Sequence, residues 1–295
     1  MTVMRSVFYV PGNREDFIAK IPNISADVVT LDLEDSVPPA EKQKARELTR
    51  QNLKFAGSAG AAIYVRVNNW ETGMTNDDCE AVVYEGLNAI CLAKCGGPDN
   101  VKRLDWKLEE LEQRRGLEIG SIQIQLLIET AKGMMNVYES ALASKRVNSL
   151  IFGAVDYTTD MRVPLNQPIG EEQKWARARV ACAARAAGII AIDCPYVAFK
   201  DTEGFEKDTQ YGRSLGFEGR MLIHPSQIEP SHRIYSPEPE RVEWAKAVVD
   251  VFEQEGIAKG SAAVSYKGKM VDTPVYIGAK KILETYAEIK ARERK

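Results

Sequence analysis

The stretch Ser121-Ile122-Gln123-Ile124-Gln125-Leu126-Leu127-Ile128-Glu129-Thr130 predicts a buried β-strand, because its apolar residues alternate and then run continuously up to a carboxylate. A second apolar segment, Ser149-Leu150-Ile151-Phe152-Gly153-Ala154-Val155-Asp156, repeats this form and also ends on an acid. In a parallel α/β sheet the carboxyl ends of the strands line the ligand crevice, so we expect Glu129 and Asp156 to meet there. We interpret the pair as ligands of a hard divalent cation. The alternative is that each acid only caps the helix that follows its strand.

Eight strand candidates of this kind alternate with helical patterns along the chain. They are Ser6–Val10, Val28–Leu33, Ala62–Val67, Ala89–Ala93, Ile122–Ile128, Ser149–Gly153, Ile189–Ile192 and Arg220–Ile223. Between them lie segments rich in Ala, Glu, Lys, Arg and Leu at helical spacing, such as Pro39–Phe55, Asp99–Arg115, Gly133–Ser144 and Glu171–Ala187. This alternation favours an α/β fold of the (β/α)8 TIM-barrel type over an open doubly wound sheet. The first strand is not followed by Gly-x-Gly-x-x-Gly, which weighs against a dinucleotide-binding unit.

Bulk composition narrows the classes of protein. The 295 residues could form two domains, although α/β barrels of this length are common. A formal net charge of -3 gives no reason to expect a nucleic-acid partner. No run of about 18 apolar residues is present, so we expect no membrane span. Met1–Val7 passes directly into a strand pattern without a signal-peptide layout, and we therefore expect a cytoplasmic location.

Nearly every expected strand end carries an ionisable side chain. These residues are Arg14, Asp32, Glu34, Asp35, Arg66, Lys94, Glu129, Asp156, Asp193 and His224. A barrel keeps its active site at this rim, and like charges crowded there need a cation or a ligand to offset them.

The inventory of possible metal ligands favours oxygen over nitrogen and sulfur. The chain has only two histidines, and the odd number of cysteines, five, argues for free thiols. Cys91 and Cys95 are four positions apart without a second Cys or His pair, so a zinc site is not expected. Carboxylates with few histidines favour magnesium. A competing interpretation makes Lys94 the Schiff-base lysine of an aldolase that works without a metal.

We divide the chain into a barrel, residues 1–235, and a C-terminal helical extension, residues 236–295. Within the extension we expect a helix over Pro237–Gln254, a loop over Gly256–Lys269 and a final helix over Thr273–Arg292. The extension is too small for an independent domain. It could close the barrel mouth or reach across to a neighbouring subunit.

Five motifs, in this order, resemble the citrate lyase β-subunit-like family of the HpcH/HpaI aldolase superfamily, which includes malyl-CoA and citramalyl-CoA lyases. They are Arg5-Ser6-Val7-Phe8-Tyr9-Val10-Pro11-Gly12, Leu31-Asp32-Leu33-Glu34-Asp35-Ser36-Val37, Val65-Arg66-Val67-Asn68, Ile128-Glu129-Thr130 and Ile223-His224-Pro225-Ser226-Gln227-Ile228. The resemblance implies a magnesium-dependent barrel, with manganese as an alternative ion. It also implies a homotrimer or hexamer that cleaves or forms a C–C bond beside a coenzyme A thioester, with a 2-oxo acid as the other small-molecule partner.

The resemblance also implies roles for individual residues. It assigns Glu129 and Asp156 to the metal and to the substrate that the metal binds, and Arg66 to substrate binding and to catalysis as the partner of an enolate oxygen. It places Tyr9, Arg14 and Lys20 at the coenzyme A portion. It makes Asp272 the catalytic aspartate that family members place over a neighbour's barrel.

Other residues are expected at the same site in lesser roles. Glu34, Asp35 and His224 are expected to support it. Val155 stands at the substrate site where an acidic or polar residue is common, which leaves the substrate open. Each role has a structural alternative: Arg66 could pair with Glu34 or Asp35, Asp272 could cap a helix, and His224 could be a packed support.

Four functions remain open. The first is a lyase that cleaves a 3-hydroxyacyl-CoA thioester of the citramalyl-CoA or malyl-CoA type to a 2-oxo acid and acetyl-CoA. The second is the citryl-acyl-carrier-protein lyase subunit of a citrate lyase complex. The third is a malyl-CoA-type thioesterase, and the fourth is a non-catalytic barrel.

Overall fold

The computed structural model describes residues 3–293 of the chain, apart from the side chains of residues 259 and 293. The chain divides into two compact units within helix α10 (Ile228–Tyr235). The first unit is Met4–His232, and the second begins at Arg233.

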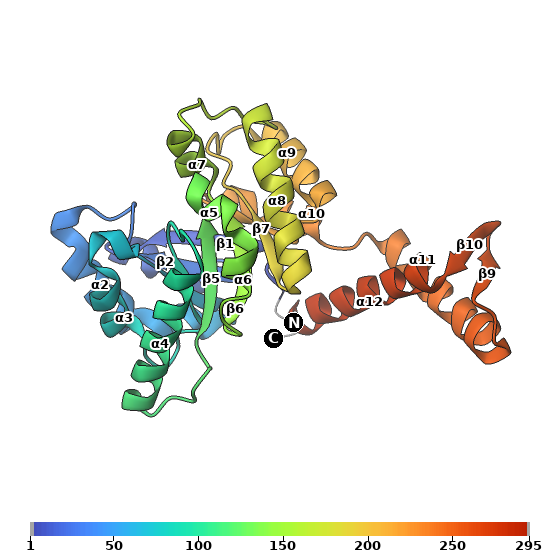
Figure 1. Ribbon diagram of the computed structural model, residues 1–295, viewed down its shortest axis with the longest axis horizontal. Helices are drawn as coiled ribbons and strands as arrows, with labels where there is room; N and C mark the ends of the chain where they lie inside the picture. The colour runs from blue at the N-terminus through green and yellow to red at the C-terminus, as the bar shows by residue number, and fades with distance from the viewer. Residues whose placement is uncertain (1–2, 294–295) are drawn as a thin grey trace. The chain divides into compact units, whose positions relative to one another are not determined.

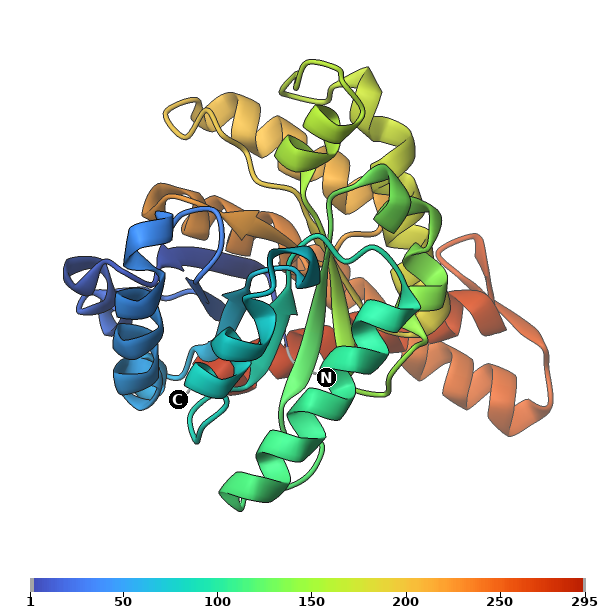
Figure 2. The ribbon, with the colours of Figure 1, turned by 60° about the vertical axis from the view of Figure 1, so that its left-hand side comes forward.

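Eight parallel strands close into a barrel in chain order, which confirms the expected TIM-barrel fold. The strands are β1 (Ser6–Pro11), β2 (Val28–Asp32), β3 (Ala62–Val67), β4 (Ala89–Leu92), β5 (Gln123–Ile128), β6 (Val147–Phe152), β7 (Ile190–Asp193) and β8 (Gly219–Leu222). Closure is made between β1 and β8, where Val7 lies opposite Met221. Figure 1 shows the helices outside these strands, and Figure 2 shows the unit from another side.

Alternate residues of each strand point into the barrel. Those that lie below the carboxyl-terminal ends of the strands are mostly apolar. Val7, Val28, Cys91, Leu127 and Ile151 belong to one buried cluster with a few other inward side chains. Because the period of a strand is two, the residues that follow in the same inward series reach the carboxyl-terminal rim. The charged rim therefore stands on an apolar floor.

The helices of the first unit surround the barrel. They are α1 (Glu15–Ile18), α2 (Lys42–Ala56), α3 (Thr75–Val82), α4 (Pro98–Arg115), α5 (Ala131–Met135), α6 (Val137–Ala141), α7 (Ala154–Asp160), α8 (Glu171–Ala187), α9 (Thr202–Leu215) and α10. The expectation of one helix over Gly133–Ser144 is wrong, because α5 and α6 are separated at Asn136. The Asn136 side-chain amide donates to the carbonyl of Gly96 at 3.0 Å, and the backbone there leaves the helical region (φ -103°, ψ 11°).

The second unit consists of two helices and a hairpin. Helix α11 (Pro239–Val251) and helix α12 (Thr273–Glu293) pack around buried Val248, Phe252 and Ala279. No helix within residues 3–293 is long and apolar enough to cross a membrane.

The loop expected over Gly256–Lys269 is wrong in its second half, where β9 (Ala263–Tyr266) pairs antiparallel with β10 (Lys269–Asp272). The two strands are joined by Lys267 and Gly268, which have φ values of 48° and 74°. A two-residue connection with both φ values positive is the turn that tight hairpins favour. The Gly at its second position was the signal for this hairpin in the sequence.

A buried ion network fixes α8 and α9 to the last two strands of the barrel. Arg177 of α8 donates from Nε to Asp193 at 3.0 Å and from Nη1 to Asp208 of α9 at 3.0 Å. Arg220 of β8 donates to the other oxygen of Asp208 at 2.5 Å. All four side chains are almost completely buried, and their formal charges balance.

We expect Asp208→Ala to lower the free energy of unfolding by about 3–5 kcal/mol, because two buried guanidinium groups lose their shared carboxylate. Chemical denaturation measures the change. Glu85→Ala is the control, since its ion pair with Lys54 is exposed and its loss should leave stability unchanged. A loss below about 1 kcal/mol for Asp208→Ala would contradict a stabilising role for the network.

Candidate active site at the barrel mouth

An arginine–aspartate pair occupies the ends of two neighbouring strands. Asp32 of β2 and Arg66 of β3 are register partners. The Arg66 guanidinium donates from Nε and Nη2 to the two oxygens of Asp32 at 2.7 and 2.6 Å, and its Nη1 lies 3.2 Å from Glu34 Oε2. Burial opposes the ionisation of Asp32, but Arg66 outweighs it and holds the pKa of Asp32 below its usual range. The alternative pair with Glu34 is therefore present, and Arg66 has in addition a two-point partner, Asp32, that was not predicted.

The loop after β2 is held rigidly around this pair. The Asp32 carboxylate accepts the main-chain N–H groups of Glu34 at 2.9 Å and Ser36 at 3.2 Å. The ammonium of Lys42 donates to the carbonyls of Leu33 and Glu34 at 2.7 and 2.8 Å. Arg66 therefore has a fixed orientation before any ligand binds.

Glu129 is a buried carboxylate that has no counter-ion in the part of the chain that is described. It follows β5 directly, is 2% exposed, and accepts the main-chain N–H of Lys94 at 2.9 Å. Burial raises the pKa of Glu129 well above its usual range. The charge of Arg66 opposes this rise, and the charges of Asp156 and Glu34 add to it. A carboxylate in this position favours a bound cation.

The backbone beside Glu129 is shaped to admit its side chain. A Cβ atom on Gly153, which follows β6, would lie 2.4 Å from Glu129 Oε2 and 2.5 Å from Glu129 Cβ. Only glycine fits this close approach. Gly153, between β6 and Asp156, thus leaves space for the side chain of Glu129.

Asp156 lies three residues after Gly153, in the first turn of α7, and is half-buried. Its Oδ1 is 3.5 Å from the ammonium of Lys94, which also contacts Glu34 at 2.5 Å and Asp35 at 3.0 Å. Burial alone would lower the pKa of Lys94, but these carboxylates outweigh it and raise the pKa. An ammonium group held in this way stays protonated, which disfavours its use as a Schiff-base nucleophile.

The donor set suits a hard divalent cation. Five carboxylates meet at this rim, those of Asp32, Glu34, Asp35, Glu129 and Asp156. Of the cationic side chains that the structure describes, only Arg66 and Lys94 pair with them. The excess is negative, and the ligand atoms are oxygens, which Mg²⁺ and Mn²⁺ prefer. Within residues 3–293, Asp35, Glu129 and Asp156 have no guanidinium partner, and Asp35 pairs instead with the Lys94 ammonium at 3.0 Å. Glu129, which has no ion pair, and Asp156, whose distance to Lys94 is 3.5 Å, could hold such an ion.

Tyr9 lies inside the barrel beside this site. Its ring faces the Arg66 guanidinium at 5.2 Å, and its hydroxyl is 3.5 Å from the thiol of Cys91. Part of it also lines a pocket of about 410 Å³ between β1, α1 and the end of β8. Tyr9 therefore connects the charged rim with this neighbouring pocket.

The other two residues expected at coenzyme A stand around an exposed aromatic ring at that pocket. Arg14 and Lys20 lie 4.0 and 5.7 Å from the ring centre of Phe17, and Phe17 and Lys20 line the pocket. Arg14 also forms an exposed two-point ion pair with Asp16, at 2.8 and 2.9 Å. The structure thus brings Arg14 and Lys20 together around Phe17.

Of three further expected residues, His224 and Asp272 have local structural roles, and Val155 is an exposed residue of α7. His224 lines the same pocket, stacks on Phe199 at 4.7 Å, and accepts the N–H of Ser226 as a helix cap. Val155 is 41% exposed and precedes Asp156 in α7. Asp272, in the second unit, accepts the N–H of Val275 at 3.2 Å and so caps α12.

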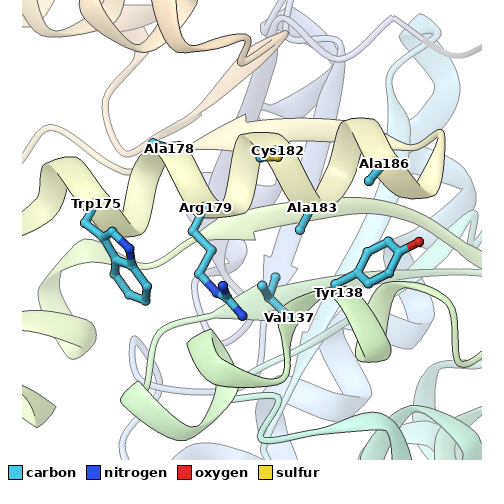
Figure 3. Close-up of a pocket in the computed structure, with 8 residues that line it drawn as sticks. All are labelled: Val137, Tyr138, Trp175, Ala178, Arg179, Cys182, Ala183 and Ala186. Carbon is cyan, nitrogen blue, oxygen red and sulfur yellow. The ribbon is translucent and has the colours of Figure 1, made fainter.

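Two other features of the first unit do not resemble this site. Ligand atoms of Asp193, Cys194 and Asp208 lie within 4.8 Å of one another, but Arg177 and Arg220 neutralise the two acids. A groove of about 370 Å³ lies on the outer surface between α6 and α8 (Figure 3). Its lining is mainly apolar, and its Arg179 is bound to the carbonyl of Met134 at 2.9 Å.

Sequence reasoning placed Asp32 and Lys94 at the rim without the roles that the structure gives them, and it did not name Gly153. Asp32 and Arg66 both end inward-facing series, at Val28-Thr30-Asp32 and Tyr64-Arg66, so strand parity was an available signal. Lys94 was predicted at a strand end, but the only role considered for it was that of a nucleophile. Gly153 gave no signal, because its role depends on the position of Glu129 in the next strand.

Comparison with known proteins places the chain in a family. Residues 5–225 match the sequence model of the HpcH/HpaI aldolase/citrate lyase family. The chain is 35% identical over 280 residues to citrate lyase subunit beta of Leuconostoc mesenteroides, covering 95% of this chain and 92% of that protein. It is 29% identical over 299 residues to mitochondrial citramalyl-CoA lyase of Mus musculus, covering 98% and 87%.

A solved structure agrees with these relatives. The protein CitE of Mycobacterium tuberculosis, in complex with magnesium, acetoacetate and coenzyme A, superposes with a TM-score of 0.76 at 26% identity, covering 97% of this chain and 98% of that one. The barrel, the order of its strands and the matched residues agree with the resemblance seen in the motifs. The chain belongs to the HpcH/HpaI aldolase/citrate lyase family.

Proposed function

We propose that the protein is a magnesium-dependent lyase that cleaves a 3-hydroxyacyl-CoA thioester of the citramalyl-CoA or malyl-CoA type to a 2-oxo acid and acetyl-CoA. The observation that carries the proposal is Glu129, a buried acid without a counter-ion, beside Asp156 and across from the fixed Arg66. The related CitE holds magnesium, acetoacetate and coenzyme A, and the mouse relative is named citramalyl-CoA lyase.

Glu129 and Asp156 would hold the ion. When bound, it supplies Lewis-acid polarisation to the hydroxyl or keto oxygen of the substrate. The main-chain N–H of Lys94 and the space left by Gly153 keep Glu129 directed to this position. Two carboxylate ligands leave several coordination positions for the substrate and water, as magnesium usually requires.

Arg66 would stabilise the charge that develops on cleavage. The substrate hydroxyl loses its proton to solvent and becomes the keto oxygen of the 2-oxo acid as the C–C bond breaks. The electron pair of that bond passes into the thioester carbonyl and forms the enolate of acetyl-CoA. Three N–H groups of Arg66 are engaged by Asp32 and Glu34, and two of the five remain for an enolate oxygen. A preorganised donor of this kind contributes about 3–4 kcal/mol to the transition state.

Asp272 would move the last proton. The enolate carbon must gain a proton to become the methyl group of acetyl-CoA, and a carboxyl group can supply it. Asp272 belongs to the second unit, so we place it over the barrel of a neighbouring copy in a homotrimer or hexamer. Its capping bond to Val275 uses one carboxylate oxygen, Oδ1, and leaves the other for this role.

The pocket beside Tyr9 would take the coenzyme A portion. Its wall combines the exposed ring of Phe17 with the ammonium of Lys20, and Arg14 stands close by. An aromatic face with flanking cations suits a base and phosphate groups.

A second candidate is a citrate lyase β subunit, which the 35% identity to the Leuconostoc protein favours. In that case the acyl group would be carried by a protein. Thioester hydrolysis after cleavage would use the same site.

We expect the purified single chain to cleave free citramalyl-CoA or malyl-CoA with Mg²⁺, and to lose this activity in EDTA. Release of the oxo acid and of the acyl-CoA product is measured for malyl-, methylmalyl-, citramalyl- and hydroxymethylglutaryl-CoA. Activity on a citryl carrier protein alone would favour the second candidate. A chain that neither binds Mg²⁺ nor cleaves any of these thioesters refutes the proposal.

We expect Gly153→Ala to weaken Mg²⁺ binding at least about tenfold, because the new methyl group would displace the Glu129 carboxylate. Isothermal titration with Mg²⁺ measures the effect without substrate. Gly278→Ala is the matched control, since a Cβ atom there meets nothing within 4 Å. Unchanged affinity in Gly153→Ala would remove Glu129 from the metal site.

We expect Asp272→Asn to lower kcat by about 100-fold or more while Mg²⁺ affinity stays unchanged, because the amide keeps the cap but cannot transfer the proton. Turnover and magnesium titration are measured on the same preparation. Near-normal turnover would leave Asp272 as a capping residue only.

A further inference from the structure

Lys94 has an unusual backbone for its residue type. It follows β4 and has a φ of 48°, in the left-handed region that favours glycine. Such a conformation persists in a non-glycine residue only where the surroundings impose it, and it is concentrated at functional sites. With this backbone, the Lys94 N–H donates to Glu129 Oε1 at 2.9 Å.

The side chain of the same residue gathers the other acids. Its Nζ lies 2.5 Å from Glu34 Oε1, 3.0 Å from Asp35 Oδ2 and 3.5 Å from Asp156 Oδ1. Three carboxylates so close together would repel one another without the ammonium group.

Glu34 extends this contact to the arginine. Its Oε1 accepts from Lys94, and its Oε2 lies 3.2 Å from Arg66 Nη1. The ammonium is therefore linked to Asp156 on one side and, through Glu34, to Arg66 on the other. Among residues 3–293, no other side chain forms ion pairs with both Asp156 and Glu34.

We propose that Lys94 is a positioning residue. Its ammonium acts as a tethered cation that ties Arg66 through Glu34 to Asp156, while its main-chain N–H holds Glu129. The proposal rests on the proposed function for the identity of the metal and of the reaction. Two consequences follow from the geometry. The ammonium competes with a metal ion for Asp156, and it sets the distance between the metal and Arg66.

Lys94→Met tests both consequences, because it keeps the main-chain N–H and a long side chain but removes the charge. We expect Mg²⁺ to bind roughly tenfold more tightly, since a positive charge close to the site is removed. The rise in Tm caused by Mg²⁺ should be correspondingly larger than in the wild type. We expect kcat to fall about 100-fold with little change in KM, because Arg66 is no longer held in register with the metal.

The matched control is Lys107→Met. Lys107 also pairs with two carboxylates, those of Glu80 and Glu110 at 2.7 and 2.8 Å, but it lies on α4. The Lys107→Met variant should keep the wild-type kcat, the wild-type Mg²⁺ affinity and the wild-type rise in Tm on addition of Mg²⁺. If the loss of any lysine simply destabilised the fold, Tm would fall in both variants, and Mg²⁺ affinity would not rise while kcat falls. That result would contradict the proposal.

The opposite movement of affinity and kcat is specific to the proposal. A Lys94→Met chain with kcat within threefold of the wild type overturns it, and so does weaker Mg²⁺ binding. Reductive trapping of pyruvate on Lys94 of the wild type would also overturn it, in favour of a nucleophile. A wild-type chain without Mg²⁺ binding or cleavage would instead refute the proposed function, which the wild-type measurements establish separately.

Discussion

The mouth of the barrel is governed by the repulsion between five carboxylates that the fold brings to one rim. Arg66 neutralises Asp32 directly, and Lys94 lies among Glu34, Asp35 and Asp156. Glu129 remains with a main-chain N–H as its only hydrogen-bond donor among the described residues. The arrangement therefore has a negative excess that a divalent cation can offset.

The apolar floor beneath the rim makes these charges act strongly on one another. Leu127 and Ile151 lie one inward position below Glu129 and Gly153, within the same buried cluster. In a medium of low dielectric the attraction between Asp32 and Arg66 is large, and the cost of an unpaired charge on Glu129 is also large. The same floor thus fixes the arginine and prepares the acid for a metal ion.

The buried network behind β7 and β8 shows the contrasting case. Arg177 and Arg220 meet Asp193 and Asp208, so two cations face two anions in a site closed to solvent. That balance gives the network a role in fixing helices to the barrel. Ligand-binding chemistry is expected where the charges do not balance, as at the mouth.

The sequence by itself determined the eight strands, because alternation of apolar residues at period two is a local property of the chain. It also indicated Glu129, Asp156 and Arg66, since each stands at or just beyond the end of such a strand. Only the tertiary structure decided that Asp32 is the partner of Arg66, that Gly153 admits Glu129, and that Lys94 joins the acids. These facts depend on register and on close approach between different strands, which local patterns do not encode. The hairpin Ala263–Asp272 lies between these cases, because the positive φ values at Lys267 and Gly268 belong to a short turn whose glycine was visible in the sequence.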